Sequence, residues 1–467
     1  MGRVPNPLYP VGRHLSPLAV MVPILCLSVP ASSQDLQARM TLTEAVEFAV
    51  EHSGIMGAAR AGTEALEGKL KQAEWAAWPH IKIRSLLAPM PRQWSAPDDF
   101  TKGGTDLSQW GVFSHTEITG YLPLYTFGKI SNLKAAARLG VDVGKAREDI
   151  ARQEVKFRVT RAFHALTLSG ELADVVSEGR SYLDKARRHL EELEESDDPE
   201  FDPVDMMKFR VYDAQVLAKE LEAKRSAGLA GAALKVAMGL APRTDVEFRT
   251  GTVKPVNLAG DLQEADLVDQ ALLSRAELVA LKRGILVREA QVRAREAAFY
   301  PNFLLAGQFK YSYTNMADGQ ASPFIYDPFN GYSAGGGLVF EWDLEIGGKL
   351  GELREAKAEF AKLREEAREA ENGIRLEVAK LYREMRDQRL LVDAQKVAME
   401  AARGWVIAKT DLYDNDLTPL NEVLDGLVQF FQTRMAYLEA VYRFNVAVAQ
   451  LERATGAPLR RDAAPDE

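Results

Sequence analysis

Four stretches of the chain alternate between apolar and polar residues, the period expected for β-strands in a sheet with two different faces. In the clearest of them, Phe303, Leu305 and Phe309 fall on one face, and Gln308 and Lys310 fall on the other. The predicted strands cover residues ~79–88, ~110–124, ~301–314 and ~331–344. Alternation fits a sheet whose apolar face meets lipid or a half-buried sheet packed on helices. Aromatic residues near the strand ends favour the membrane.

A long helical pattern follows each pair of strands. Apolar residues recur every seven positions at Leu353, Phe360, Ala367, Ile374 and Leu381, and at Ala136, Val143, Ile150 and Phe157. This period predicts left-handed coiled-coil packing. The pattern is unbroken over ~129–168 and ~349–385, and each helix is expected to turn back shortly afterwards. We therefore predict helical hairpins over ~128–240 and ~348–455, with rods of about 60 Å at 1.5 Å per residue.

The two halves of the chain follow one plan, which indicates an internal duplication. Pro79 matches Pro301 at an offset of 222 residues, and Ala241-Pro242 matches Ala457-Pro458 at an offset of 216. Each half is predicted to contain a helix, two strands and a helical hairpin. The predicted organisation is a first repeat at 34–242, a linker at 243–261, a second repeat at 262–458 and a disordered tail at 459–467.

Glycine and proline mark the expected junctions between helices and strands. Gly128-Lys129 and Gly348-Lys349 resemble the end of a phosphate-binding loop, but Ile130 and Leu350 stand where that motif requires Ser or Thr. We expect Gly128 and Gly348 to form strand-to-helix turns, where glycine permits unusual backbone angles. Pro79 and Pro301 are expected to mark the preceding helix-to-strand junctions.

The first 33 residues have the pattern of a secretory signal peptide. Arg3 and Arg13 precede the apolar run LAVMVPILCLSV, and small residues follow before a predicted cleavage after Ser33. The run is too short to span a bilayer, and no later apolar stretch reaches the ~18–20 residues of a membrane helix. If the mature protein crosses a membrane, it must therefore do so with strands.

Composition excludes several classes of function. The net charge of −9 argues against binding to a nucleic-acid backbone. The single cysteine, Cys26, cannot form an internal disulfide or a cysteine-based metal site. The six histidines are scattered, and no Ser-His-Asp or paired-carboxylate set is evident. We therefore predict no enzyme activity, no catalytic residue, no metal site and no cofactor.

Two acidic segments interrupt the helical patterns at equivalent places. They are EELEESDDPEFDPVD (191–205) and DLYDNDLTP (411–419). The first segment is rich in oxygen ligands suited to calcium, but its spacing does not match an Asp-x-Asp-x-Asp-Gly loop. We interpret both as solvated breaks within the returning helices.

At this level of detail the chain resembles the TolC family of outer-membrane efflux proteins, also called outer membrane factors. The resemblance covers nearly all of the mature chain, in both halves and in the same order. It is carried by MTLTEAVEFAVEHSGIMGAAR (40–60), AAWPHIKI (76–83), AAFYPNFLL (297–305), YLPLYTFGKISNLKAA (121–136) and the closing segment 417–458.

The resemblance implies an α+β membrane protein that forms a homotrimer. Each protomer would give four strands to a shared 12-stranded outer-membrane β-barrel and long hairpins to a periplasmic α-helical barrel. The family's members are passive exit ducts of tripartite efflux or type I secretion systems. The expected partners are outer-membrane lipid, a periplasmic adaptor protein and an inner-membrane pump of RND, ABC or MFS type. Nucleic acid is not among them.

The resemblance also suggests positions for partner contacts. Adaptors dock on the hairpin tips, which would be Thr167, Leu168, Ser169 and Gly170, and Arg386, Asp387, Gln388 and Arg389. Gly404 and Ile407 stand where family members carry acidic gate residues, so no gate residue is assigned. A periplasmic adaptor or a non-catalytic coiled-coil envelope scaffold is the alternative interpretation, and an envelope hydrolase a third. The cargo and the class of pump are left open.

Overall fold

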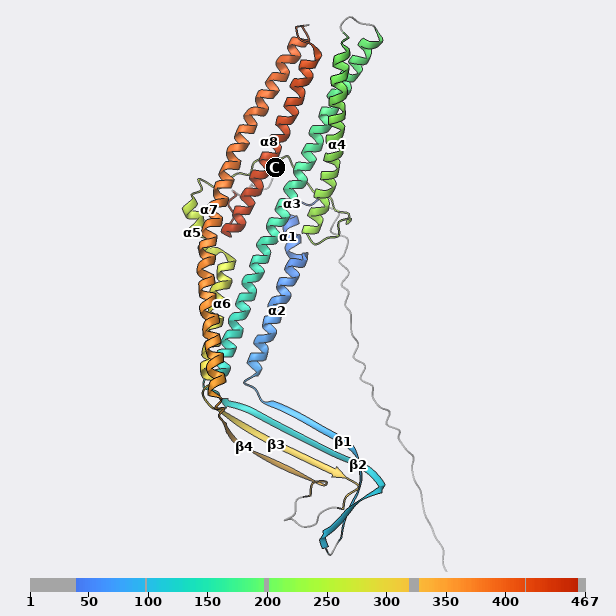
Figure 1. Ribbon diagram of the computed structural model, residues 1–467. Helices are drawn as coiled ribbons and strands as arrows, with labels where there is room; N and C mark the ends of the chain where they lie inside the picture. The colour runs from blue at the N-terminus through green and yellow to red at the C-terminus, as the bar shows by residue number, and fades with distance from the viewer. Residues whose placement is uncertain (1–38, 97–98, 197–200, 319–326, 416, 461–467) are drawn as a thin grey trace, which may run out of the picture.

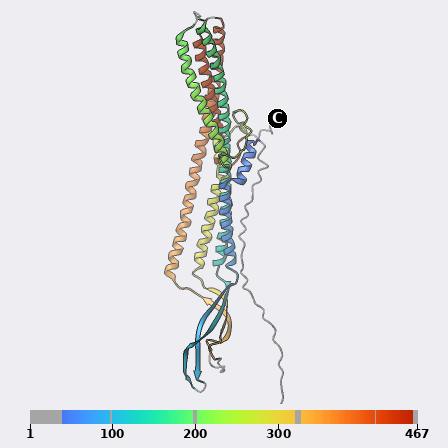
Figure 2. The same cartoon turned by 90° about the vertical axis from the view of Figure 1, so that its right-hand side faces the viewer.

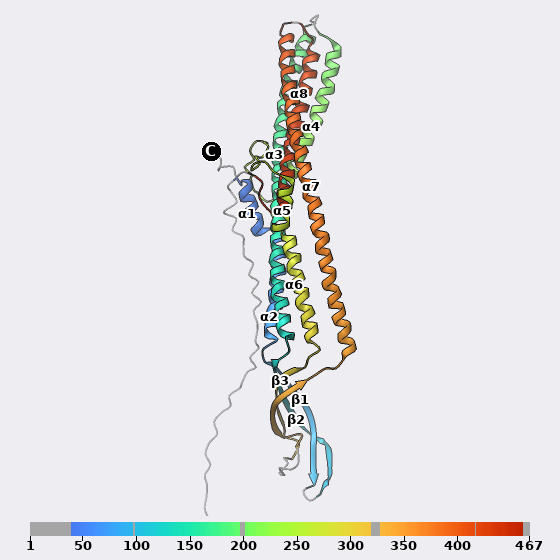
Figure 3. The same cartoon turned by 90° about the vertical axis from the view of Figure 1, so that its left-hand side faces the viewer.

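The protein is an elongated rod of helices with a β-sheet at one end (Figure 1). The computed structural model describes residues 39–96, 99–196, 201–318, 327–415 and 417–460. The signal peptide predicted at 1–33 therefore lies outside the described residues. Figures 2 and 3 show that the sheet lies at the end opposite the two helical hairpin ends and that the connection between the halves projects at mid-height.

The internal duplication predicted from the sequence is present, because the same six elements occur twice. The first set is α1 (Leu42–His52), α2 (Gly54–Trp75), β1 (His80–Ala96), β2 (Asp99–Tyr125), α3 (Lys129–Glu195) and α4 (Pro203–Ala237). The second set is α5 (Glu264–Ser274), α6 (Ala276–Ala297), β3 (Asn302–Thr314), β4 (Gly331–Glu341), α7 (Ile346–Tyr413) and α8 (Leu420–Thr455). The helix predicted at the start of each repeat is in fact two helices, of 11 and 22 residues in both cases.

Local chemistry explains several of the helix ends. Thr41 and Glu44 form a capping box at the start of α1, and Ser53 caps α2 by accepting a bond from the Met56 amide. Asp202 caps α4, and Pro203 fills its first position, where no amide donor is needed. Gly456 ends α8 in the left-handed conformation that glycine adopts without strain.

The predicted positions of the hairpin ends are wrong. α3 runs without interruption for 67 residues and α7 for 68, which is about 100 Å each at 1.5 Å per residue. The two helices of each hairpin instead meet between Glu195 and Pro203 and between Tyr413 and Leu420. The residues expected at the tips lie inside α3 (Thr167, Leu168, Ser169 and Gly170) and inside α7 (Arg386, Asp387, Gln388 and Arg389).

The physical reason is that the heptad pattern continues past both expected turns. Ser169, Val176, Leu183 and Leu190 are all buried at seven-residue intervals along α3. In α7, Val378, Met385 and Val392 do the same. The Thr167 and Ser169 hydroxyls donate to the carbonyls of Phe163 and Leu166, so these polar side chains are satisfied within a continuous helix.

The four strands form one antiparallel sheet in the order β1-β2-β3-β4. Both strands of the first pair are longer than the predicted ~79–88 and ~110–124, because β1 continues to Ala96 and β2 begins at Asp99. Pro89 and Pro91 are tolerated because β1 is an edge strand, where a missing amide donor interrupts no ladder. β4 is shorter than predicted and ends at Glu341.

Three apolar clusters stabilise the rod along its length. One joins α5, α7 and α8 around Phe444, another joins α1, α3 and α4 around Val159, and the third lies near the hairpin ends around Leu190. The predicted linker 243–261 packs through Val253 and Val256 on the first cluster. Leu459 is buried there too, so the tail predicted at 459–467 does not begin at 459; 461–467 lie outside the described residues. None of the helices described combines the length and the apolarity needed to cross a membrane.

Candidate functional site

One face of the sheet exposes an unusual amount of apolar surface. The strand register places Ile83, Ile118 and Phe309 side by side, with further apolar residues above and below them. Several are more exposed than surface residues of a water-soluble sheet would be, with Tyr332 at 81% and Leu338 at 78%. The other exposed members are Ile81, Ile83, Leu87, Leu305, Phe309, Tyr311, Tyr313 and Phe340. A continuous apolar patch of this kind indicates contact with an apolar surrounding.

The opposite face of the same sheet is polar. Its central row joins Arg84, Glu117 and Lys310 across three strands, and Glu117 lies 3.9 Å from Arg84 and 3.6 Å from Lys310. Gln308 donates to Glu117 at 2.5 Å. Farther along, the ring of His115 lies 2.8 Å from the Ser312 hydroxyl. The sheet therefore separates an apolar surrounding from a polar one.

Both edges of this sheet are open in the single chain. Among the four strands, β1 pairs only with β2 and β4 only with β3. Outside the strands, the Gln93 amide near the far end of β1 donates to the Met316 carbonyl. Unpaired backbone donors and acceptors at a sheet edge are costly in an apolar surrounding. The two edges therefore need a partner strand each.

The two outer helices in the upper half of the rod also expose apolar side chains. In that half α4 and α7 are the outermost helices, with α3 and α8 between them (Figure 1). The α4 seam is Val204, Met207, Val211, Ala214, Ala218 and Leu221, and the α7 seam is Leu390, Ala394, Val397, Ala401, Gly404 and Ala408. All twelve residues are exposed and follow the three- and four-residue spacing of a coiled coil.

The two seams are suited to each other. Each covers a comparable length and begins close to its hairpin end, so the seams lie at the same level of the rod. Arg210 and Lys224 flank the α4 seam, whereas Asp393 and Glu400 flank the α7 seam. Opposite charges beside an apolar seam favour pairing of the two helices. Gly404, at a position expected for a gate acid, is part of the α7 seam, and Ile407 lies beside it.

Polar contacts tie the two hairpins together near their ends. The Tyr413 hydroxyl lies 2.8 Å from Nε2 of His189, and the Asn421 amide donates to Asp205 at 2.9 Å. Farther down, the Tyr212 hydroxyl donates to Asp425, and this bond raises the pKa of Tyr212 to about 12. At the end of the second hairpin, Leu417 exposes 72% of its surface.

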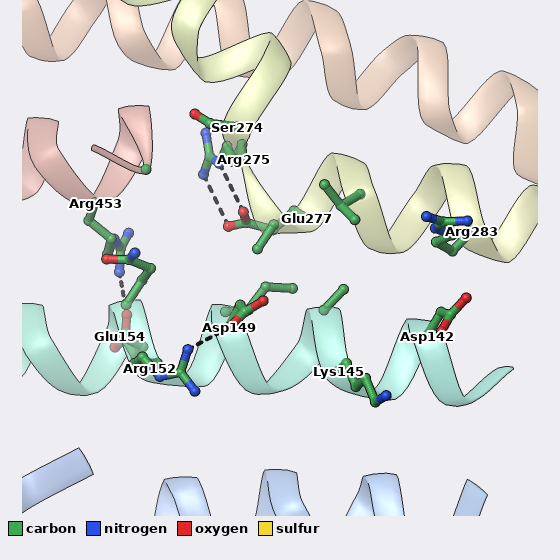
Figure 4. Close-up of a pocket in the computed structure, with 16 residues that line it drawn as sticks. Asp142, Lys145, Asp149, Arg152, Glu154, Ser274, Arg275, Glu277, Arg283 and Arg453 are labelled. Carbon is green, nitrogen blue, oxygen red and sulfur yellow. Dashed lines mark hydrogen bonds and ion pairs between the residues drawn. The ribbon is translucent and has the colours of Figure 1, made fainter. Parts of the chain in front are cut away.

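A charged cavity of about 480 Å³ lies where α3, α6 and the end of α8 meet (Figure 4). Arg275 is 9% exposed and pairs with Glu277 at 3.2 Å and with Glu377 at 2.5 Å. Burial opposes its charge, but the bond to Glu377 and the field of Glu277 raise its pKa overall. Arg453 pairs with Glu154 across the same space. Ion pairs therefore link the helices around the cavity, although Nε of Arg275 makes no hydrogen bond in the described structure.

The residues predicted at the junctions of helices and strands lie in different structural settings. Gly128 caps α3 with a φ of 92°, a left-handed conformation that requires glycine. Gly348, by contrast, lies within the first turn of α7, because that helix begins at Ile346; the expectation of a glycine turn is wrong there. Pro79 and Pro301 lie directly before β1 and β3.

Sequence reasoning missed the true hairpin ends and the two seams. Pro199, Pro203 and Pro419 marked the ends, but they were interpreted as breaks in the returning helices. The seam spacing was present in the sequence, but only the structure shows which apolar stripes are left uncovered. No three or more His, Cys, Asp or Glu residues in the described ranges are arranged to hold a metal ion.

Comparisons with known proteins agree with this architecture. The family model described as outer membrane efflux protein matches residues 267–457. No curated protein matches the sequence.

Solved structures share the fold over most of the chain. VceC from Vibrio cholerae is 17% identical, with 90% of this chain and 97% of that chain covered and a TM-score of 0.68. The CmeC outer membrane channel of Campylobacter jejuni is 14% identical, with 91% and 87% covered and a TM-score of 0.71. The open state of the MtrE outer membrane channel of Neisseria gonorrhoeae is 14% identical, with 90% and 90% covered and a TM-score of 0.70. The family match thus covers most of the second repeat, and the solved structures show that the rod and the sheet together have the fold of these outer membrane channels.

Proposed function

We propose that the protein is the exit duct of a tripartite export system and conducts cargo passively across the periplasm and the outer membrane. The observation that carries the proposal is the sheet: one face is exposed and apolar, the other is polar, and both edges are open. A sheet with these properties meets lipid on one side and lines water on the other once its edges are closed.

Closure by three copies explains the remaining open surfaces. The free edge of β4 in one protomer would pair with the free edge of β1 in the next, giving a 12-stranded barrel. In the same arrangement the α7 seam of one protomer would cover the α4 seam of its neighbour. The homotrimer thus satisfies the sheet edges and the helix seams together.

The long helices set the reach of the duct. At about 100 Å, α3 and α7 extend far beyond any membrane, into the periplasm. We propose that a periplasmic adaptor binds the hairpin ends at 196–202 and 414–419, and that an inner-membrane pump supplies the energy. The protein itself acts without catalysis. The class of pump and the cargo are not assigned.

Reconstitution of the purified protein in planar lipid bilayers tests the duct directly. We expect discrete conductance steps whose size does not change with added nucleotide. As a matched control, protein unfolded by heat before reconstitution should give no steps. The proposal would be contradicted if folded protein gave no conductance steps at either low or raised voltage.

A further inference from the structure

The polar face of the sheet carries a localised excess of positive charge. Two neighbouring rows contain Lys82, Arg84, Lys310 and Glu117, with Thr119 and Gln308 as uncharged neighbours. We call Lys82, Arg84 and Lys310 the basic belt. Three cations against one carboxylate leave a surplus of two positive charges in each chain, although the whole chain is acidic, with a net charge of −9.

The single acid of these rows is already engaged. The Glu117 side chain is 21% exposed and lies between Arg84 and Lys310, with Gln308 donating to it. Arg84 remains 67% exposed, and Lys82 is exposed and pairs with no described acid. The positive charge of the belt therefore faces the water on this side of the sheet.

The neighbouring levels of the sheet do not offset this charge. Next to the helices, Asp343 pairs with Lys349 at 3.4 Å, and Lys129 bonds to Asn302, the strand neighbour of Glu341. At the far end, Arg92 lies opposite Asp106 in the register. At both levels acids stand beside the bases, so the surplus of positive charge is confined to the belt.

We infer that the basic belt makes the pore selective for anions, so that the cargo class favoured by the duct is anionic. The inference rests on the proposed function, because the polar face must line a closed pore. In a trimer the three belts form a ring of like charge inside a wall of low dielectric, which concentrates the field in the water. Rings of Lys and Arg are a known basis for anion preference in pores.

Reversal potentials in a KCl gradient test the inference on bilayers that contain the conducting wild-type protein. We expect chloride to be more permeant than potassium. Lys82→Glu should reduce the chloride-to-potassium permeability ratio by about twofold or more, because it replaces an exposed cation in the focused field of the pore. Glu117→Gln should raise the chloride-to-potassium ratio, because it removes the acid that lies between Arg84 and Lys310.

Lys254→Glu is the matched control, since it makes the same charge change at an exposed lysine of the connection 243–261, outside the sheet. It should leave the ratio unchanged. A cation-selective wild-type pore, or a ratio that Lys82→Glu does not alter, would overturn the inference while leaving the duct intact. Folded trimers that conduct no ions would overturn both, and trimer mass confirms folding of each variant.

Discussion

At the residue scale, most ion pairs described in this protein lie on the surface, and Arg275 is the most buried of the side chains that form them. Exposed pairs add little to stability, because water screens them and ordering the side chains costs entropy. The Arg275 side chain is only 10% exposed and joins α6 to α7 through Glu377. In the first repeat the equivalent residue is Ser53, which caps a helix and makes no such link. The ion pair of Arg275 with Glu377 is therefore specific to the second repeat.

Replacement of Arg275 by alanine should destabilise the protein by about 2–4 kcal/mol, because it leaves Glu377 without its partner in a partly buried site. The control is Arg293→Ala, which removes an exposed pair with Glu289 and should cost less than about 0.5 kcal/mol. Thermal unfolding in detergent measures both. Equal effects of the two substitutions would contradict the role given to Arg275.

His164 should make stability depend on pH. Burial, together with the nearby charge of Arg460, lowers its pKa to about 4, and its Nε2 has no hydrogen-bond partner in the described structure. The folded protein therefore keeps His164 neutral where the unfolded chain, with a pKa near 6.5, takes up a proton. Stability is complete above pH ~6.5 and falls as the pH drops toward ~4, by up to about 3 kcal/mol.

Melting temperatures of wild type and His164→Gln, measured between pH 7 and pH 4.5, test this. The variant should lose less stability on acidification than wild type. His52→Gln, which alters an exposed histidine, should retain the wild-type slope. Parallel slopes for wild type and His164→Gln would refute the assignment.

At the element scale, the proposed adaptor contact lies at the ends of the two helical hairpins. Their ends are 196–202 and 414–419, about 40 Å farther from the sheet than a turn near residue 168 would place them, at 1.5 Å per residue. The exposed Leu417 is the largest apolar side chain described at the second end. An apolar side chain held out at a helix turn is suited to insertion between helices of a partner.

Leu417→Asp should abolish export in cells while leaving trimer formation and bilayer conductance unchanged, because it alters only the surface offered to the adaptor. Arg386→Ala, at a position expected at the tip from sequence alone, should leave export intact because it lies within α7. Export of a reporter cargo, measured beside trimer abundance in the membrane, distinguishes the two. Loss of export in Arg386→Ala alone would contradict the placement of the contact.

The strands and the duplication could be predicted from the sequence, because alternation and fixed offsets are local patterns. The hairpin ends could not be predicted, because two signals in the sequence conflict. Prolines at 199, 203 and 419 indicate turns there, whereas the clearest part of the heptad pattern ends near residues 168 and 385. The ion pair of Arg275 with Glu377 joins residues 102 positions apart, and no local pattern reveals it. The basic belt could be recognised only from the register of the strands, which brings Lys310 beside Glu117.

At the scale of the whole molecule, a single chain is incomplete. Its sheet has two open edges, and its outer helices expose two apolar seams. Each surface is costly if it stays uncovered. In a ring of identical chains, β4 of each chain meets β1 of the next and the α7 seam meets the next α4 seam, so all four surfaces are covered. A two-fold dimer would instead bring each surface against its own copy.

Val397→Lys should prevent or weaken trimer formation, because it places a charge in the middle of the α7 seam. Gln429→Lys introduces the same charge at an exposed position of α8, which lies inside the protomer wall, and should leave the trimer intact. Mild-detergent gels of membrane extracts report the trimer fraction. A stable Val397→Lys trimer would show that the seam is not an interface.

The central claim is that three chains complete one duct, and native mass spectrometry of the mature protein, extracted from the membrane in mild detergent, tests it most directly. The account predicts a mass three times that of the mature chain. A folded monomer from the membrane fraction would leave four strands with open edges in lipid, and this result would contradict the account.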